Sequence, residues 1–183
     1  MKENFMKSLE LILKYEGGFS GHNHDHDRGG PTNLGITLRT LQNFYNQYGY
    51  GDFDRDGDID VDDIRLLDTI EKAAPVYKTY FWDAMKLDNY PSRVDFILFD
   101  FAVNSGPKNA VKLLQRALNK LQEYSLIIDG IAGPKVRSAM NKVDIELLIC
   151  ALLNERDIFY RKIVAMDHSQ EVFLRGWLNR VAN

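Results

Sequence analysis

The stretch LELILKYEGGFSGHNHDHDRGGPTNLGIT runs from Leu9 to Thr37 and contains the features that decide the fold. Its first part predicts an α-helix that ends near Glu16. Phe5, Leu9 and Ile12 recur at a spacing that puts them on one helix face together with Glu16. Two glycines follow, and glycine readily takes the left-handed conformation with which many helices end. We therefore expect a helix that carries one carboxylate into a polar, glycine-rich loop.

The position of Glu16 indicates a chemical role for its carboxyl group. Burial against an apolar face disfavours the charged form and raises the pKa of a glutamate, so that it can hold a proton and donate it. The alternative is a glutamate at a frayed helix end whose side chain points to water. The helical pattern by itself leaves both interpretations open.

Several short motifs are spread along nearly the whole chain. They are EGGF at 16–19, DRGGPTNLGIT at 27–37, YFW at 80–82, FDFAVNSG at 99–106, LQRAL at 114–118, DGIAGP at 129–134 and GWLNR at 176–180. Together they resemble the signature of glycoside hydrolase family 108, the N-acetylmuramidases. Three features depart from that signature: the loop before Asp27 is slightly longer, Arg28 replaces a proline and Leu34 replaces an aromatic residue.

The resemblance implies an all-α, lysozyme-like fold with at most a small β-hairpin near residues 18–36. It implies an enzyme, a peptidoglycan hydrolase that cuts the glycan strand between N-acetylmuramic acid and N-acetylglucosamine. It also implies a catalytic lobe over residues 1–105 and a peptidoglycan-binding helical lobe over residues 106–183, packed as one unit. The alternative is a catalytically inactive wall-binding or secretion-assisting protein with the same fold.

Hydrolysis of a glycosidic bond uses a general acid and usually a second carboxylate. The resemblance implies Glu16 as the acid and Asp27 as the second group. Asp25 is the alternative, because its offset from Glu16 matches the family pattern better. Thr32 is expected to orient water or the N-acetyl group. Substrate binding is expected at five further residues: Asn33, Thr37, Tyr80, Trp82 and Asn104.

Residues 52–63 fit the pattern of an EF-hand calcium loop, with a glycine at its sixth position and an acid at its last. The expected ligands are Asp52, Asp54, Asp56, Asp58 and Asp63. Aspartates this close together repel one another unless a cation lies between them. Because the loop lies outside the stretch that contains Glu16, we expect one calcium ion that serves stability, and no cofactor in catalysis. The alternative is an acidic turn without an ion.

Two other features are not expected to carry chemistry. The run from His22 to Asp27 alternates histidine with other polar residues, which invites a metal interpretation. Ligands spaced by two in a loop lack the fixed geometry of a zinc site, so a solvated loop is the better interpretation. The single Cys150 lies in an apolar helical run and is expected to be a buried, unreactive thiol.

The composition restricts where the protein acts and what it binds. A chain of 183 residues, 45% of them hydrophobic, can bury a core without disulfides. The net charge of -3 argues against nucleic-acid binding. Neither a membrane span nor a leader-peptide pattern is recognisable. We expect a monomer made in the cytoplasm that acts on peptidoglycan at the cell wall or periplasm. A holin or a secretion system would release it, as for a phage or prophage endolysin.

Overall fold

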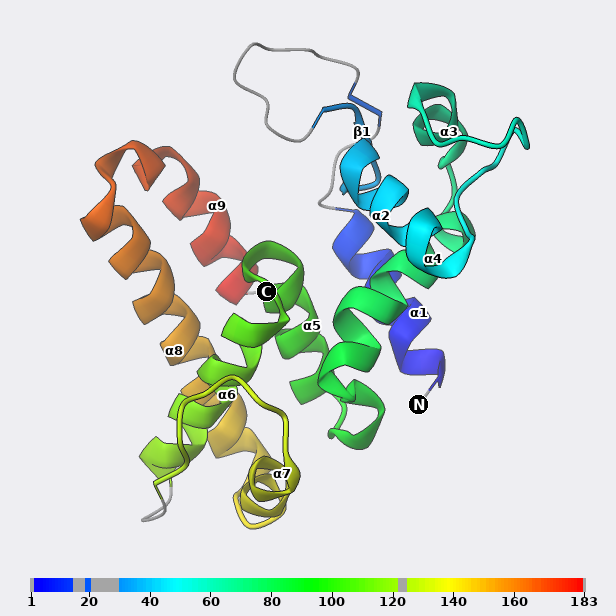
Figure 1. Ribbon diagram of the computed structural model, residues 1–183. Helices are drawn as coiled ribbons and strands as arrows, with labels where there is room; N and C mark the ends of the chain where they lie inside the picture. Colours follow the sequence, from blue (N-terminus) through cyan, green and yellow to red (C-terminus); the bar gives the residue numbers. More distant parts are fainter. Residues whose placement is uncertain (1, 15–18, 21–29, 122–124, 183) are drawn as a thin grey trace. The chain divides into compact units, whose positions relative to one another are not determined.

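The computed structural model describes residues 2–14, 19–20, 30–121 and 125–182. These residues form helices and one small antiparallel sheet (Figure 1). The chain divides into two compact units, Met1–Trp82 and Asp83–Asn183. The prediction of an all-α fold with at most a small hairpin is confirmed for the described residues.

The first unit packs helices against a short hairpin. Its elements are α1 (Lys2–Leu13), β1 (Thr32–Asn33), β2 (Ile36–Thr37), α2 (Leu38–Tyr48), α3 (Val61–Leu66), α4 (Ile70–Tyr77) and the π-helix η1 (Lys78–Asp83), which extends one residue beyond the unit. Helix α1 packs on α4, while α3 contacts both β1 and α2. The hairpin therefore packs on α2, which precedes residues 52–63, and on α3, which begins near their end. We call residues 52–63 the acidic loop.

The apolar face predicted for α1 is buried in the core. Phe5, Leu9 and Ile12 are all buried. The ring of Trp82 meets the ring of Phe5 edge-on, with centroids 5.4 Å apart. Full burial of a large apolar side chain contributes about 1.5–3 kcal/mol, so this face fixes the rotation of α1.

The sequence predicts a helix between Thr37, a typical N-cap residue, and Gly49, a typical residue at a helix end, and helix α2 has both ends. The hydroxyl of Thr37 caps its N-terminus by accepting a hydrogen bond from the amide of Thr40 at 3.1 Å. Gly49 ends it in the left-handed region, at φ 67°, and its amide donates to Tyr45 O. Helix α4 does not end at a glycine. It contains Pro75, and the chain continues from it directly into the π-helix η1.

The second unit is a group of helices around α5. Its elements are η2 (Leu87–Asn89), α5 (Val94–Ser105), α6 (Pro107–Leu121), α7 (Pro134–Met140), α8 (Ile145–Met166), η3 (His168–Gln170) and α9 (Glu171–Ala182). Helix α5 packs against α6 and α8, α6 lies along α8, and α9 returns along α8 (Figure 1).

Helix α5 supplies the centre of that unit. Five of its apolar residues recur at helical spacing, which predicts a core face, and all five are buried: Val94, Ile97, Leu98, Phe101 and Ala102. Among them, the carboxylate of Asp100 pairs with the guanidinium of Arg156 at 2.7 Å, with side-chain exposures of 7% and 2%. Helix α5 was expected in the catalytic lobe, over residues 1–105, but its core face packs on helices of the second unit.

Two local predictions are wrong. Cys150 is exposed, because α8 buries the opposite face, which carries Leu148 and Leu152. A serine directly before an apolar stripe is a typical N-cap, so the sequence predicts that Ser92 caps α5. The helix instead begins after Arg93, which lies at φ 76° and makes no side-chain cap.

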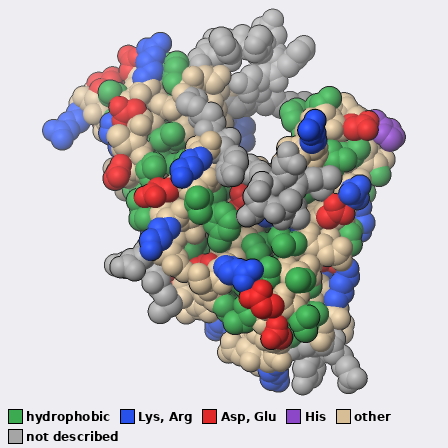
Figure 2. Space-filling view, turned by 180° about the vertical axis from the view of Figure 1, so that it is seen from behind, with side chains coloured by type: hydrophobic (Ala, Val, Ile, Leu, Met, Phe, Trp, Pro, Cys, Tyr) green, Lys and Arg blue, Asp and Glu red, His purple; other side chains and the backbone are tan. Residues whose placement is uncertain are grey.

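The surface carries both signs of charge. Acidic and basic side chains are interspersed over the face in Figure 2. Long-range attraction therefore contributes little on this face, and recognition depends on local groups. Within the described ranges, no helix combines the length and the apolar character needed to cross a membrane.

Candidate active site and acidic loop

The hairpin that carries the predicted site residues is held by several bonds. Thr32 pairs with Thr37 and Asn33 pairs with Ile36. The turn residues Leu34 and Gly35 both have positive φ, 46° and 72°, as a tight hairpin turn requires. The hydroxyl of Tyr77 in α4 donates to the carbonyl of Leu34 at 2.9 Å. This bond fixes a turn that holds a non-glycine residue in an unfavourable conformation.

Thr32 combines a fixed backbone with an available side chain. Its main chain exchanges hydrogen bonds of 2.8 and 3.0 Å with Ser20 on one side and pairs with Thr37 on the other. Its side chain is half-buried, and its hydroxyl forms no hydrogen bond with the described residues. The hydroxyl can therefore bind water or a substrate oxygen.

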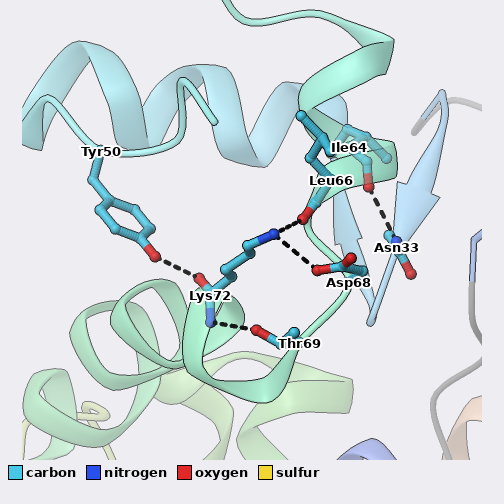
Figure 3. A network of polar contacts seen from close by, with 7 residues as sticks. All are labelled: Asn33, Tyr50, Ile64, Leu66, Asp68, Thr69 and Lys72. Atoms are coloured by element: carbon cyan, nitrogen blue, oxygen red, sulfur yellow. Dashed lines mark hydrogen bonds and ion pairs between the residues drawn. The ribbon is translucent and has the colours of Figure 1, made fainter. Parts of the chain in front are cut away.

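Asn33 and Thr37 were predicted to bind substrate, but their side chains have structural partners. Asn33 is only 5% exposed, and its amide donates to the carbonyl of Ile64 at 3.1 Å (Figure 3). The hydroxyl of Thr37 caps α2 and also lies 2.9 Å from the hydroxyl of Thr40. Burial leaves Asn33 little surface with which to contact a substrate, and its amide nitrogen is bonded within the protein, so its role in substrate binding stays a prediction.

Two aromatic residues of η1 pack on helices of the first unit. Trp82 is 1% exposed and packs on α1, so the prediction that it forms a substrate wall is not supported. Tyr80 is half-buried, with its ring edge-on to Phe44 of α2 at 5.3 Å. Burial raises the pKa of Tyr80, with a smaller effect from Tyr48. Tyr80 therefore keeps a partly open face, and its contact with substrate stays a prediction.

The remaining predicted site residues lie in the second unit or outside the described residues. Asn104 belongs to the second unit, where it is exposed and its amide donates to the carbonyl of Asp100 at 2.9 Å. Glu16, Asp25 and Asp27 lie outside the described residues, as does the histidine-rich run. The roles expected for these carboxylates stay predictions.

The acidic loop closes on a buried carboxylate. Asp63 is 0% exposed, and its two oxygens accept hydrogen bonds from the amides of Phe53, at 2.6 Å, and Asp60, at 3.1 Å. Asp52 accepts from the amides of Arg55 and Gly57, at 2.6 and 3.2 Å. The first and last carboxylates of the loop therefore organise its backbone.

Two groups of carboxylates converge in this loop. One consists of Asp52, Asp54 and Asp63, the other of Asp58, Asp60 and Asp63, and within each group one oxygen per residue lies within 4.8 Å of the others. Asp60 was not among the expected ligands, whereas Asp56, which was, belongs to neither group. Among the described residues these are the sets suited to a cation.

Mutual repulsion is visible in the pKa values of the loop. The neighbouring carboxylate of Asp56 raises the pKa of Asp58, followed by desolvation and the other loop acids. At Asp54, the largest single effect is a hydrogen bond from the amide of Asp56, which lowers its pKa. Desolvation and the carboxylates of Asp56, Asp63 and Asp52 outweigh it, so that the pKa of Asp54 is raised.

Lys72 connects the end of α3 to α4 (Figure 3). Its ammonium donates to the carbonyl of Leu66 at 2.6 Å and to Asp68 at 2.9 Å. The hydrogen bond from Lys72 lowers the pKa of Asp68. The same ammonium lies 5.5 Å from the ring centroid of Phe53 in the acidic loop. No sequence motif predicts these contacts, because they join residues through packing.

A family comparison identifies the part of the chain that contains the hairpin and the acidic loop. Residues 9–106, more than half of the chain, match the model described as Glycosyl hydrolase 108. The chain belongs to glycosyl hydrolase family 108. Residues 109–182 of this family 108 protein match a second model, described as Predicted Peptidoglycan domain. The protein is a glycoside hydrolase of the N-acetylmuramidase type, and peptidoglycan is its substrate.

A solved structure supports the lysozyme-like helical fold of the family 108 hydrolase. The structure of SagA from Brucella abortus is 29% identical, with a TM-score of 0.75, and the similarity covers 100% of this chain and 91% of that one. A comparison with curated proteins gave no match. Nothing in these comparisons favours the alternative of a catalytically inactive wall-binding protein.

The family matches and the compact units divide the hydrolase at different places. The first match ends at residue 106, whereas the first unit ends at Trp82. Helix α5 lies between these two positions and packs on α6 and α8, within the second match. Helix α5 thus belongs to the segment that matches the hydrolase model, but it packs on helices of the segment that matches the peptidoglycan domain.

In the second unit of the family 108 hydrolase, a buried glutamine shapes the loop before α7. The amide nitrogen of Gln115 donates to Asp129 at 2.7 Å, and its oxygen accepts from the amide of Gly130 at 2.9 Å. The bond from Gln115, followed by one from the amide of Ile131, lowers the pKa of Asp129. Gly130 lies at φ 78°, where a Cβ would come within 2.8 Å of the Lys108 carbonyl, so glycine is required.

Proposed function

We propose that Glu16 is the general acid with which this hydrolase cleaves the bond between N-acetylmuramic acid and N-acetylglucosamine. Protonation of the leaving oxygen allows the bond to break, while a second carboxylate activates water or stabilises the oxocarbenium-like centre. Asp27 takes this second role in the proposal, with Asp25 as the alternative. Thr32 orients the water or the N-acetyl group.

The observation that carries this proposal is the available hydroxyl of Thr32 on a fixed backbone. The hairpin holds Thr32 between Ser20 and Thr37, so that its side chain is positioned without being used by the protein. A positioned hydroxyl of this kind lowers the entropic cost of orienting a reactant. The buried face of α1 adds support, since the role of Glu16 was inferred from the register of that face.

Digestion of purified peptidoglycan by the intact protein tests the reaction. We expect new reducing ends that carry N-acetylmuramic acid and no new free amines. New amines without new reducing ends would identify an amidase or a peptidase and would contradict the proposal. A protein that binds the wall and releases neither product would correspond to the inactive alternative.

We also propose that residues 52–63 bind one calcium ion. The convergence of carboxylates on Asp63 and the raised pKa values of Asp54 and Asp58 support this proposal, because both show negative charge that a cation would compensate. The ion would be held by Asp52, Asp54 and Asp63, with Asp58 and Asp60 as further oxygen donors. Its proposed role is to stabilise the fold, and catalysis needs no cofactor.

The substrate gives the proposed place of action. Peptidoglycan lies outside the cytoplasm, so we propose that the protein acts at the cell wall or periplasm. Its release through a holin or a secretion system, its origin as a phage or prophage endolysin, and its monomeric state stay predictions. Light scattering of the purified protein measures the last of these directly.

A further inference from the structure

A pocket open to solvent lies between α6 and α8 in the second unit. It contains about 240 Å³ of space, open solvent included, and its lining residues are Arg116, Glu155, Ile158, Phe159 and Lys162. All five lie within residues 109–182, which match the peptidoglycan domain. The pocket therefore belongs to the part of the chain expected to hold the wall polymer, and it contains none of the residues assigned to catalysis.

Two cations of this pocket are uncompensated. Neither Arg116 nor Lys162 forms an ion pair or a hydrogen bond with the described residues. The acid of the pocket is already neutralised, because Glu155 lies 2.5 Å from the ammonium of Lys120 and its side chain is 6% exposed. A protein with a net charge of -3 thus has two positive groups at one depression that no carboxylate of the described residues pairs with.

Next to these cations the pocket has an apolar wall. Ile158 and Phe159 are both half-buried. The ring of Phe159 is held edge-on to the ring of Phe101, with centroids 5.0 Å apart, so the core fixes this side of the pocket. Cations beside an apolar wall suit a carboxylate that is next to a small apolar group, and a guanidinium suits a carboxylate especially well.

We propose that this pocket binds the stem peptide of peptidoglycan. A free carboxylate of the peptide pairs with Arg116 and Lys162, and an alanine methyl group packs on Ile158 and Phe159. The choice of the peptide follows from charge, because stem peptides carry free carboxylates beside alanine side chains. The inference rests on peptidoglycan as the substrate. In this proposal the second unit binds the stem peptide, while the first unit acts on the glycan strand.

The test uses the intact protein and two synthetic peptides. One is L-Ala-γ-D-Glu-L-Lys-D-Ala, and the other has the same sequence with its carboxylates converted to amides. We expect the acid peptide to bind in a calorimetric titration and the amide peptide to bind at least about tenfold more weakly. Neither peptide has a glycosidic bond, so peptide binding without release of reducing ends would overturn the proposed function and leave this inference standing.

Paired variants locate the binding. Lys162→Ala is the milder change, because Lys162 is exposed. The double variant Lys162→Ala with Arg116→Ala should bind the acid peptide at least about tenfold more weakly than the parent protein does. The control combines Lys135→Ala with Arg175→Ala, which removes the same charges from exposed positions outside the pocket and should leave the affinity unchanged.

Five outcomes would overturn the inference. Four of them are no binding of the acid peptide at millimolar concentration, equal binding of the amide peptide, unchanged binding by Lys162→Ala and the double variant, and an equal loss in the control. Binding of poly(glycerol phosphate) in place of the peptide would also overturn it, since the pocket would then be a site for phosphate polymers.

Discussion

The side-chain amide of Asn33 in β1 donates a buried hydrogen bond to the main-chain carbonyl of Ile64 in α3, at 3.1 Å (Figure 3). Ile64 directly follows Asp63, the buried carboxylate on which the acidic loop closes. The guanidinium carbon of Arg65 lies 5.7 Å from the ring centroid of Phe19. Phe19 directly precedes Ser20, whose main chain pairs with Thr32 of the hairpin. The acidic loop is remote from the hairpin in sequence, yet its exit helix supports the hairpin directly.

Asn33→Ala should destabilise the first unit. The change leaves the carbonyl of Ile64 buried without its partner, which costs about 1–3 kcal/mol. Thermal unfolding measures this loss. The control is Asn89→Ala, because Asn89 makes the same kind of bond to the carbonyl of Lys86 at 3.2 Å in an exposed position. If Asn33 contacted substrate instead, its variant would keep its stability and raise KM.

Calcium should raise the melting temperature. An ion that binds only the folded state adds about 2.7 kcal/mol at a concentration one hundred times its Kd. Combining Asp52→Asn with Asp54→Asn should erase the effect. Asp62→Asn should retain it, because Asp62 pairs with Arg65 and belongs to neither carboxylate group. If neither calcium nor a chelator changed the melting temperature, the loop would be an acidic turn that does not bind calcium. A cleavage rate that tracks calcium far below the melting temperature would give the ion more than a stabilising role.

The stabilisation by calcium should grow with pH. The pKa values of Asp54 and Asp58 are raised in the folded protein, so without an ion this state binds more protons than the unfolded chain. Their contribution to stability is therefore present at low pH and is lost as the pH rises through the raised pKa values. Calcium replaces those protons. The difference in melting temperature between calcium and chelator should be larger near pH ~7 than near pH ~4. Equal differences at both pH values would contradict this account.

Arg156→Met should strongly destabilise the second unit. It removes the guanidinium that pairs with the buried carboxylate of Asp100, and breaking a buried pair typically costs about 3–5 kcal/mol. Arg161→Met is the control on the same helix, since Arg161 pairs with Asp157 at 2.8 Å with its own side chain 60% exposed, a geometry worth about 0.3–0.5 kcal/mol. Chemical denaturation compares the two variants. Equal effects would show that the pair of Asp100 and Arg156 does not hold α5 in place.

Local patterns in the sequence predicted most of the helices. The apolar spacing of α1, the cap of α2 by Thr37 and the stop at Gly49 depend on residues a few positions apart, so the chain itself displays them. The small hairpin was expected from the family resemblance.

Contacts between distant segments could not be predicted in this way. Asn33 looked available for substrate because nothing near it in sequence reveals that Ile64 lies beside it. The residues YFW at 80–82 showed aromatic character but not the π-helix that turns Trp82 into the core. Cys150 shares an apolar run with residues that α8 buries on its other face.

The central claim is that Glu16 supplies the proton for glycan cleavage, and the rate of reducing-end release by Glu16→Gln tests it most directly. Glu10→Gln is the control, because Glu10 is an exposed glutamate of α1. We predict that Glu16→Gln unfolds at the same temperature as the parent protein and loses several orders of magnitude in rate, while Glu10→Gln keeps its rate. A folded Glu16→Gln variant within about tenfold of the parent rate, about 1.4 kcal/mol of barrier, would contradict the claim.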